Sequence, residues 1–130
     1  MTFEPVPPED ERIGAIINDA ALVVHRALGP GLLESVYEVC LAHELRKRGL
    51  NVRRQEPILI TYDGLQFEEG FRCDLFVEER VICEVKSVQE LHPVFTAQVL
   101  TYLKFMNLRL AFLLNFNERL MKEGIQRIVR

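Results

Sequence analysis

The sequence predicts an α/β domain with three layers, in which helices cover both faces of a central mixed β-sheet. Three observations indicate this class. First, two helical patterns precede three β-rich runs joined by short turns, and a third helical pattern then precedes another apolar run. Second, the turns between the three β-rich runs are short, which predicts antiparallel strands, whereas the apolar run after the third helix is expected to lie parallel to a neighbouring strand. Third, residues 75–77 and 81–85 carry apolar side chains that face both ways, so helices are expected on both sides of the sheet.

Length and composition limit the domain organisation. The chain has 130 residues, of which 48% are hydrophobic and 27% are charged, and this is enough for one globular domain with its own core. We expect this domain over residues 9–130, after a proline-rich extended arm at residues 1–8. The net charge of −3 excludes a nucleic-acid binder that depends on strong overall positive charge, but it leaves room for a local basic patch.

Other features indicate a cytoplasmic protein without a membrane partner. No apolar run approaches the length of a membrane span, and the acidic N-terminus does not fit a signal peptide. The three cysteines, Cys40, Cys73 and Cys83, are odd in number and lack the spacing of a metal finger. We therefore expect reduced thiols.

The first two elements are expected to be helices. One begins near residues 9–11, where acidic side chains suit the positive end of a helix, and stops at Gly29-Pro30-Gly31. The next runs from about residue 32 to residue 48, with Gly49 as a left-handed cap.

The middle of the chain is expected to form an antiparallel meander of three strands. The strands cover residues 52–62, 65–77 and 81–87. Asp63-Gly64 predicts a two-residue hairpin turn, and Gly70 predicts a bulge in the second strand.

The last third of the chain returns to helix and strand. Pro93 suits the first turn of a third helix, which is expected to end near Asn107. Residues 108–116 are expected to join the sheet through a crossover, and residues 125–129 form a last short strand.

The hairpin around residues 78–80 carries the strongest functional signal. If these residues form the loop, Val77 pairs with Val81 and the same register sets Asp74 opposite Glu84. Alternation then places Lys86 on the same face. Like charges opposite each other destabilise a sheet, and unpaired buried charges cost several kcal/mol. A divalent cation is the simplest compensation.

Several residues in the predicted helices are also candidates for the functional site, and each of them has a structural interpretation as well as a functional one. Glu34 is by itself an acid that stabilises a helix start, but together with the hairpin acids it is a third carboxylate. Gln98 and Tyr102 share a helix face, either as a structural pair or as site residues. The run at residues 46–48 suits a helix C-terminus first and a phosphate-binding patch second.

Three motifs together resemble the PD-(D/E)XK nuclease superfamily. Asp74 followed by Glu84-Val85-Lys86 after a hairpin is similar to its core. Residues 31–37 match the GxxExxY signature of a family of small bacterial and archaeal proteins in that superfamily, and residues 98–102 match the QxxxY element of its RecB-like exonuclease branch. Two positions depart from the pattern: Cys73 replaces a proline that often precedes the aspartate, and Asn117 stands where relatives often carry glycine. Neither change removes a ligand.

The resemblance implies a restriction-endonuclease-like fold and metal-dependent hydrolysis of phosphodiester bonds in nucleic acid, with DNA as the expected substrate. It implies that Asp74, Glu84 and the Val85 carbonyl bind Mg²⁺ or Mn²⁺, and that Glu34 completes the shell or holds a water. Lys86 would orient the water or stabilise the transition state.

It also implies that Gln98 and Tyr102 position the nucleic-acid backbone or support the lysine. Residues 53–54 and 46–48 would touch flanking phosphates. The small size of the domain leaves room for a homodimer or a protein partner.

Three hypotheses follow, in order of preference. The first is an active metal-dependent nuclease. The second is a nuclease-fold module that binds nucleic acid or a protein without cutting. The third is a structural α/β protein in which Asp74, Glu84 and Lys86 form a buried ion-pair network.

Overall fold

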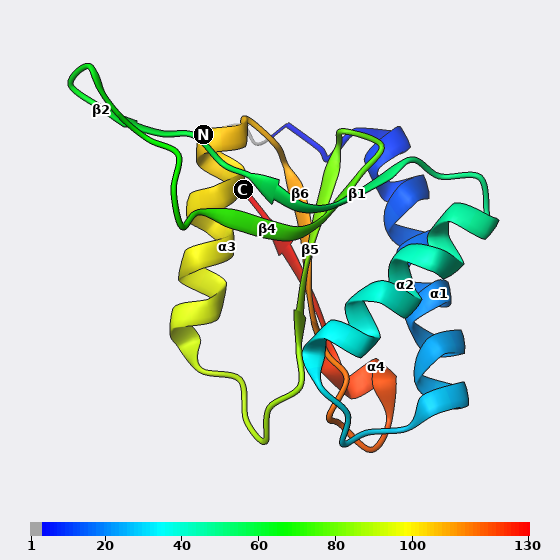
Figure 1. The fold of residues 1–130 in the computed structure, drawn as a ribbon. Helices are drawn as coiled ribbons and strands as arrows, with labels where there is room; N and C mark the ends of the chain where they lie inside the picture. Colours follow the sequence, from blue (N-terminus) through cyan, green and yellow to red (C-terminus); the bar gives the residue numbers. More distant parts are fainter. Residues whose placement is uncertain (1–3) are drawn as a thin grey trace.

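A computed structural model of the chain describes residues 4–130 (Figure 1). Helices and strands follow the predicted order, except that each of the first two predicted strands is divided into two strands and a short helix precedes the last strand. In chain order the elements are α1 (Pro8–Leu28), α2 (Glu34–Lys47), β1 (Val52–Pro57), β2 (Ile60–Tyr62), β3 (Leu65–Phe67), β4 (Arg72–Val77), β5 (Val81–Lys86), α3 (Pro93–Met106), β6 (Leu110–Asn115), α4 (Met121–Gly124) and β7 (Ile125–Val129).

The central sheet has five strands in the order β1-β4-β5-β6-β7. β1, β4 and β5 form an antiparallel meander, and Val77 pairs with Val81 as expected. After the α3 crossover, β6 lies parallel to β5, and β7 then pairs antiparallel with β6. The predicted mixed sheet is therefore confirmed.

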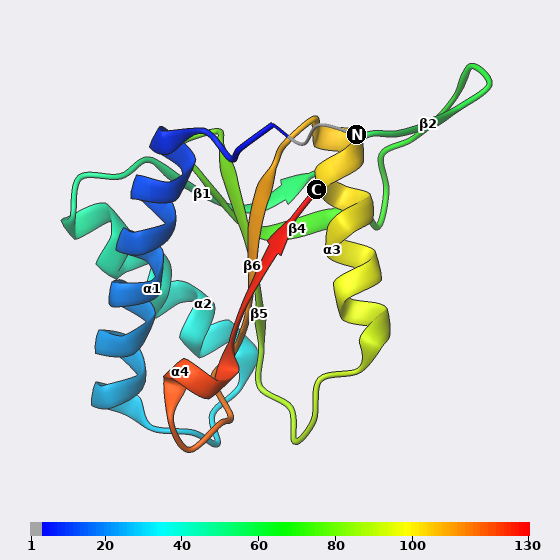
Figure 2. The same ribbon diagram turned by 180° about the vertical axis from the view of Figure 1, so that it is seen from behind.

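Helices lie on both sides of this sheet (Figures 1 and 2). α1 and α2 cover one side and bury the larger apolar cluster, which includes Ile17, Leu41 and Val85. α3 covers the other side and buries a second cluster, which includes Ile82, Leu103 and Leu113. Because β5 contributes to both clusters, its side chains are buried on both faces, and the predicted restriction-endonuclease-like layering is confirmed.

Helix ends follow the local sequence. Gly49 adopts a positive φ of 85° after α2, and the Leu50 N–H returns to the Leu45 carbonyl at 3.2 Å. This is the left-handed cap that the glycine predicted. Asn107 ends α3 in the same conformation, with a φ of 56°. α1 begins at Pro8, and residues 1–3 of the predicted arm lie outside the described residues.

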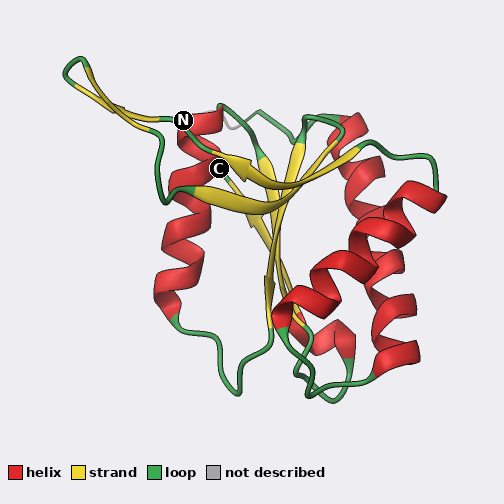
Figure 3. Cartoon of the chain, in the orientation of Figure 1, coloured by secondary structure: helices red, strands yellow, loops and turns green. Residues whose placement is uncertain are grey.

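The prediction of long first and second meander strands is wrong. β1 stops at Pro57, which lacks the N–H needed to continue a ladder. β2 and β3 pair only with each other and form a separate hairpin that projects from the body (Figure 3). Its turn at Asp63 and Gly64 has two positive φ angles, 46° and 80°, as predicted for a two-residue turn. Gly70 lies in the returning loop, so it is not a bulge within a strand.

Across residues 4–130, none of the helices combines the length and the apolar character needed to cross a membrane.

Candidate active site

Asp74 and Glu84 meet where the β4–β5 ladder stops. The paired residues run from Val77 and Val81 to Leu75 and Cys83. Beyond these pairs, backbone N–H groups donate to carboxylate side chains of the opposite strand instead of to its carbonyl groups. The Asp74 N–H donates to Glu84 Oε1 at 3.1 Å, and the Val85 N–H donates to Asp74 Oδ2 at 2.8 Å. The two acids thus lie together, as the register predicted, and each is held by the opposite strand.

The surroundings of Glu84 disfavour the ionised form of its carboxyl group. Its side chain is buried, with the residue only 5% exposed, whereas Asp74 is half-buried. Burial, followed by the negative charge of Asp74, raises the pKa of Glu84 to about 9. At neutral pH this carboxyl therefore holds either a proton or a compensating cation.

Lys86 supplies positive charge from the same strand. Its Nζ lies 4.3 Å from the centroid of the Phe95 ring on α3, which is a cation–π contact. The lysine charge partly offsets the rise in the pKa of Glu84. The ammonium thus lies near enough to Glu84 for its charge to lower the pKa of that carboxyl.

α3 brings Tyr102 towards the same acids. The tyrosine is buried, and its pKa is raised by burial first and then by the charges of Glu84 and Asp74. Gln98 lies one turn earlier on α3 and is exposed. Tyr102 therefore lies close enough to Glu84 and Asp74 for their charges to raise its pKa, whereas Gln98 is exposed to solvent.

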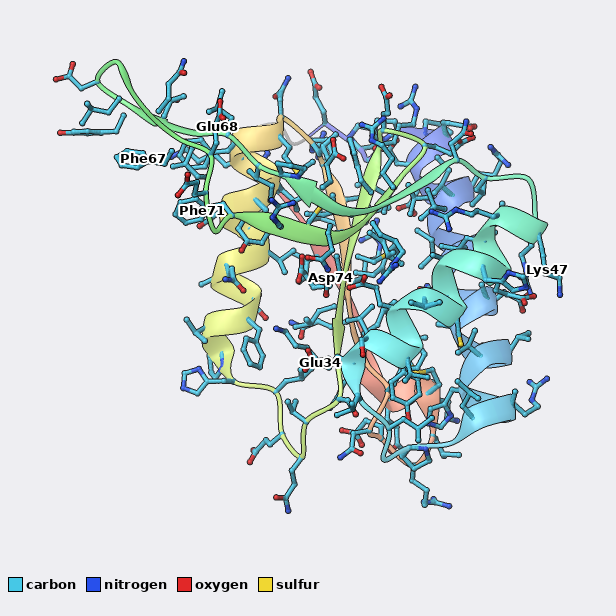
Figure 4. The ribbon with its side chains drawn as sticks, viewed as in Figure 1. Glu34, Lys47, Phe67, Glu68, Phe71 and Asp74 are labelled. Atoms are coloured by element: carbon cyan, nitrogen blue, oxygen red, sulfur yellow. The ribbon has the colours of Figure 1, made fainter. Side chains whose placement is uncertain are left out.

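Glu34 reaches the end of β5 from the first turn of α2. Its Oε1 accepts the N–H of Ser87, the residue after Lys86, at 3.3 Å. Ser87 Oγ in turn donates to the Leu32 carbonyl at 2.7 Å. Figure 4 shows Glu34 at the start of α2 and Asp74 on the sheet, both near the middle of the molecule. Glu34 therefore adjoins the lysine end of the site.

Tyr37 explains the spacing of the GxxExxY residues. Its hydroxyl donates to the Gly29 carbonyl and accepts the Leu32 N–H, the latter at 3.1 Å. Its ring stacks on Phe116 with the centroids 4.6 Å apart. The tyrosine thus fixes the loop that leads into Glu34, so its part in the motif is structural.

Sequence reasoning missed Glu38 and Gln55. Glu38 is buried, and Gln55 Nε2 donates to Glu38 Oε1 at 2.7 Å and to Asp74 Oδ1 at 3.1 Å. Burial, and after it the charge of Asp74, raises the pKa of Glu38, while bonds from Arg54 and Gln55 lower it. The i, i+4 spacing from Glu34 to Glu38 was an available signal, because such residues share a helix face. No sequence signal pointed to Gln55.

The basic residues expected to touch phosphates already have partners within the chain. This holds for both predicted groups: Arg53 pairs with Glu56 and Glu79, Arg54 with Glu38, Lys47 with Glu44, and Arg48 with Asp19, while Arg46 donates to the Val52 carbonyl.

The carboxylate pair fits a hard cation by its chemistry. Asp74 and Glu84 provide oxygen donors, and a cation beside them would favour the ionised form of Glu84, which burial and the charge of Asp74 disfavour. Within the described 127 residues, 4–130, no three His, Cys, Asp or Glu side chains are already arranged to hold a metal ion. Glu34 is instead bonded to Ser87. The site thus offers two carboxylates, with Glu34 near the end of β5.

The comparisons with known proteins differ in outcome. No curated protein and no solved structure matches the chain. A family model described as the PD-(D/E)XK nuclease superfamily matches residues 11–128, which run from α1 to β7 and include the whole β4–β5 hairpin. The chain therefore belongs to the PD-(D/E)XK nuclease superfamily.

Proposed function

We propose that this protein is a divalent-metal-dependent nuclease that hydrolyses phosphodiester bonds of DNA. We further propose that it acts in the cytoplasm as one domain over residues 9–130, and that it belongs to the GxxExxY family in the RecB-like branch. Nucleases of this superfamily generally use divalent metal ions. The observation that carries the proposal is the meeting of Asp74 and Glu84 beside Lys86 on one hairpin.

The acidic residues would hold the ion. Asp74, Glu84 and the Val85 carbonyl are the proposed ligands, with Glu34 as a further ligand or as the acceptor of a water. Mg²⁺ and Mn²⁺ suit such oxygen donors. When bound, the ion would lower the pKa of a water nucleophile and offset charge on the scissile phosphate.

The remaining residues would act on the substrate. The Lys86 ammonium carries positive charge to the oxygens of the phosphate, where negative charge increases in the transition state. The face of the Phe95 ring contacts that ammonium and would help to orient it towards the phosphate. Tyr102, close to the acids, and Gln98, exposed on the same helix, would position the nucleic-acid backbone.

A nuclease assay tests the proposal directly. Purified protein is incubated with Mg²⁺ or Mn²⁺ and with circular or linear, single- or double-stranded DNA. We expect cleavage by the wild type and its loss in Glu84→Ala and in Lys86→Ala. Glu68→Ala is the matched control, because Glu68 is an exposed acid in the projecting hairpin region (Figure 4). Undiminished cleavage in both site variants would overturn the assignment.

A second candidate is a module that binds nucleic acid or a protein partner without cutting. The ion pairs of Arg53, Arg54 and Arg48 favour its protein-binding form over its nucleic-acid-binding form, because they engage the side chains that would otherwise contact phosphates. It predicts binding to DNA or to a partner, with no cleavage under any divalent ion. Metal-dependent cleavage that is lost in Glu84→Ala excludes it.

A further inference from the structure

Gln55 has an unusual backbone at the point where β1 passes the site. Arg54 pairs with Leu75 and Glu56 pairs with Cys73, so Gln55 is the residue of β1 that faces Asp74 across the ladder. Its φ is +54°, in the left-handed region. A non-glycine residue there is uncommon and energetically unfavourable, and such strain concentrates at functional sites.

The Gln55 side chain bridges two carboxylates. Its Nε2 lies 2.7 Å from Glu38 Oε1 and 3.1 Å from Asp74 Oδ1. Only the NH₂ end of an amide can donate to two acceptors, so the chemistry of its partners fixes the orientation of the amide. Gln55 thus links two negative groups without adding a charge.

Glu38 anchors this bridge on the helical side. It is 6% exposed, and its Oε2 accepts a hydrogen bond from Arg54 Nε at 2.9 Å and forms an ion pair with Arg54 Nη2 at 2.8 Å. The arginine therefore occupies one oxygen of Glu38 and leaves the other for Gln55. On the far side, Asp74 Oδ1 accepts from Gln55 while Oδ2 accepts from the Val85 N–H at 2.8 Å. Both oxygens of Asp74 are thereby fixed.

We propose that Gln55 is a positioning residue, which sets the orientation of the Asp74 carboxylate for metal binding and is itself anchored by Glu38. The inference rests on the proposed function, because the orientation of Asp74 affects metal affinity only if Asp74 binds the ion. Hydrogen bonds to a ligating carboxylate are worth about 10- to 100-fold in metal affinity or activity. Loss of the amide is therefore expected to weaken divalent-ion binding by about that factor.

Two substitutions separate this role from a contribution to folding. Gln55→Ala and Gln55→Gly both remove the amide, but only glycine adopts a positive φ without strain. Gln55→Gly is thus expected to melt at a higher temperature than Gln55→Ala in chelator. Because positioning depends on the amide alone, both variants are expected to lose the same Mn²⁺ affinity.

The experiment measures Mn²⁺ affinity by calorimetry, melting in chelator, and DNA cleavage for the wild type and both variants. Gln66→Ala, in an exposed strand of the projecting hairpin, is the matched control and is expected to bind Mn²⁺ like the wild type. An equal loss of affinity in the two Gln55 variants, despite unequal stability, supports the inference. A loss that follows the stability of each variant assigns Gln55 a structural role and overturns it.

Two other outcomes distinguish a failure of this inference from a failure of the proposed function. If the wild type binds Mn²⁺ and cleaves DNA, and both Gln55 variants match it, the inference fails and the proposed function stands. If the wild type neither binds a divalent ion nor cleaves DNA, the proposed function fails and the inference falls with it.

Discussion

Asp74 and Glu84 hold each other across the β4–β5 hairpin. The Asp74 N–H donates to the Glu84 carboxylate at 3.1 Å, and the N–H that follows Glu84, that of Val85, donates to the Asp74 carboxylate at 2.8 Å. Each acid therefore takes the place of a carbonyl in the ladder. The arrangement satisfies the backbone donors, but it brings two negative groups together at a buried position, and this has measurable consequences.

One consequence is a stability that depends on pH when metal is absent. The pKa of Glu84 is about 9 in the folded chain, against an ordinary value of 4.5. Between these values the folded state binds the extra proton, so stability falls as pH rises, by at most about 1.4 kcal/mol per pH unit. We expect urea unfolding in chelator from pH 5 to 9 to show this decline. Glu84→Gln, which does not titrate, should lack this component, and equal slopes in the two proteins would contradict the prediction.

A second consequence is proton release on metal binding. Because the pKa of Glu84 is raised to about 9, the carboxyl is largely protonated at pH 7 in the absence of metal. A metal ligand must be deprotonated, so Mn²⁺ binding should release close to one proton. Affinity should then rise up to about tenfold per pH unit and level off above the pKa. Calorimetry in buffers of different ionisation enthalpy measures the released proton, and binding without release at pH 7 would show that Glu84 is not the ligand.

Phe95 should affect turnover more than metal binding. Its ring holds the Lys86 ammonium at 4.3 Å, and such contacts are worth about 0.5–2 kcal/mol. Phe95→Leu is therefore expected to lower kcat by roughly 2- to 30-fold and to leave Mn²⁺ affinity unchanged. Phe105→Leu is the matched control, because its ring lies 5.8 Å from Lys104 Nζ on the same helix. An equal fall in kcat for both variants would rule out a special role of Phe95.

Local chemistry explains which parts of the fold could be predicted. Alternation and a short charged loop set the β4–β5 register, so the sequence alone was enough to place Asp74 beside Glu84. Gly49 and the Asp63-Gly64 turn were predictable for the same reason, since their conformations depend on a few neighbouring residues.

The sequence did not predict the features that depend on contacts between residues far apart in the chain. Apolar residues continue after Pro57, so periodicity alone did not show that β2 and β3 leave the sheet as a separate hairpin. Gln55 reaches Asp74 from a backbone in the left-handed conformation, and a glutamine in a sequence does not predict that conformation. Glu38 became a site neighbour only because β1 and α2 lie side by side, linked by its bond to Arg54.

Tyr37 provides a test of how the loop before α2 supports the site. Tyr37→Phe keeps the ring stacked on Phe116 but removes the hydroxyl that joins the Gly29 carbonyl to the Leu32 N–H. Leaving these part-buried groups without a partner should lower the free energy of unfolding by about 1–3 kcal/mol. Because the loop leads directly into Glu34, cleavage should fall as well, even at temperatures where the variant is fully folded. Urea unfolding and cleavage rates measure the two effects. Tyr62→Phe on the projecting hairpin is the control, since Tyr62 is 73% exposed and should change neither. Unchanged stability and cleavage in Tyr37→Phe would show that the stacked ring alone holds the loop.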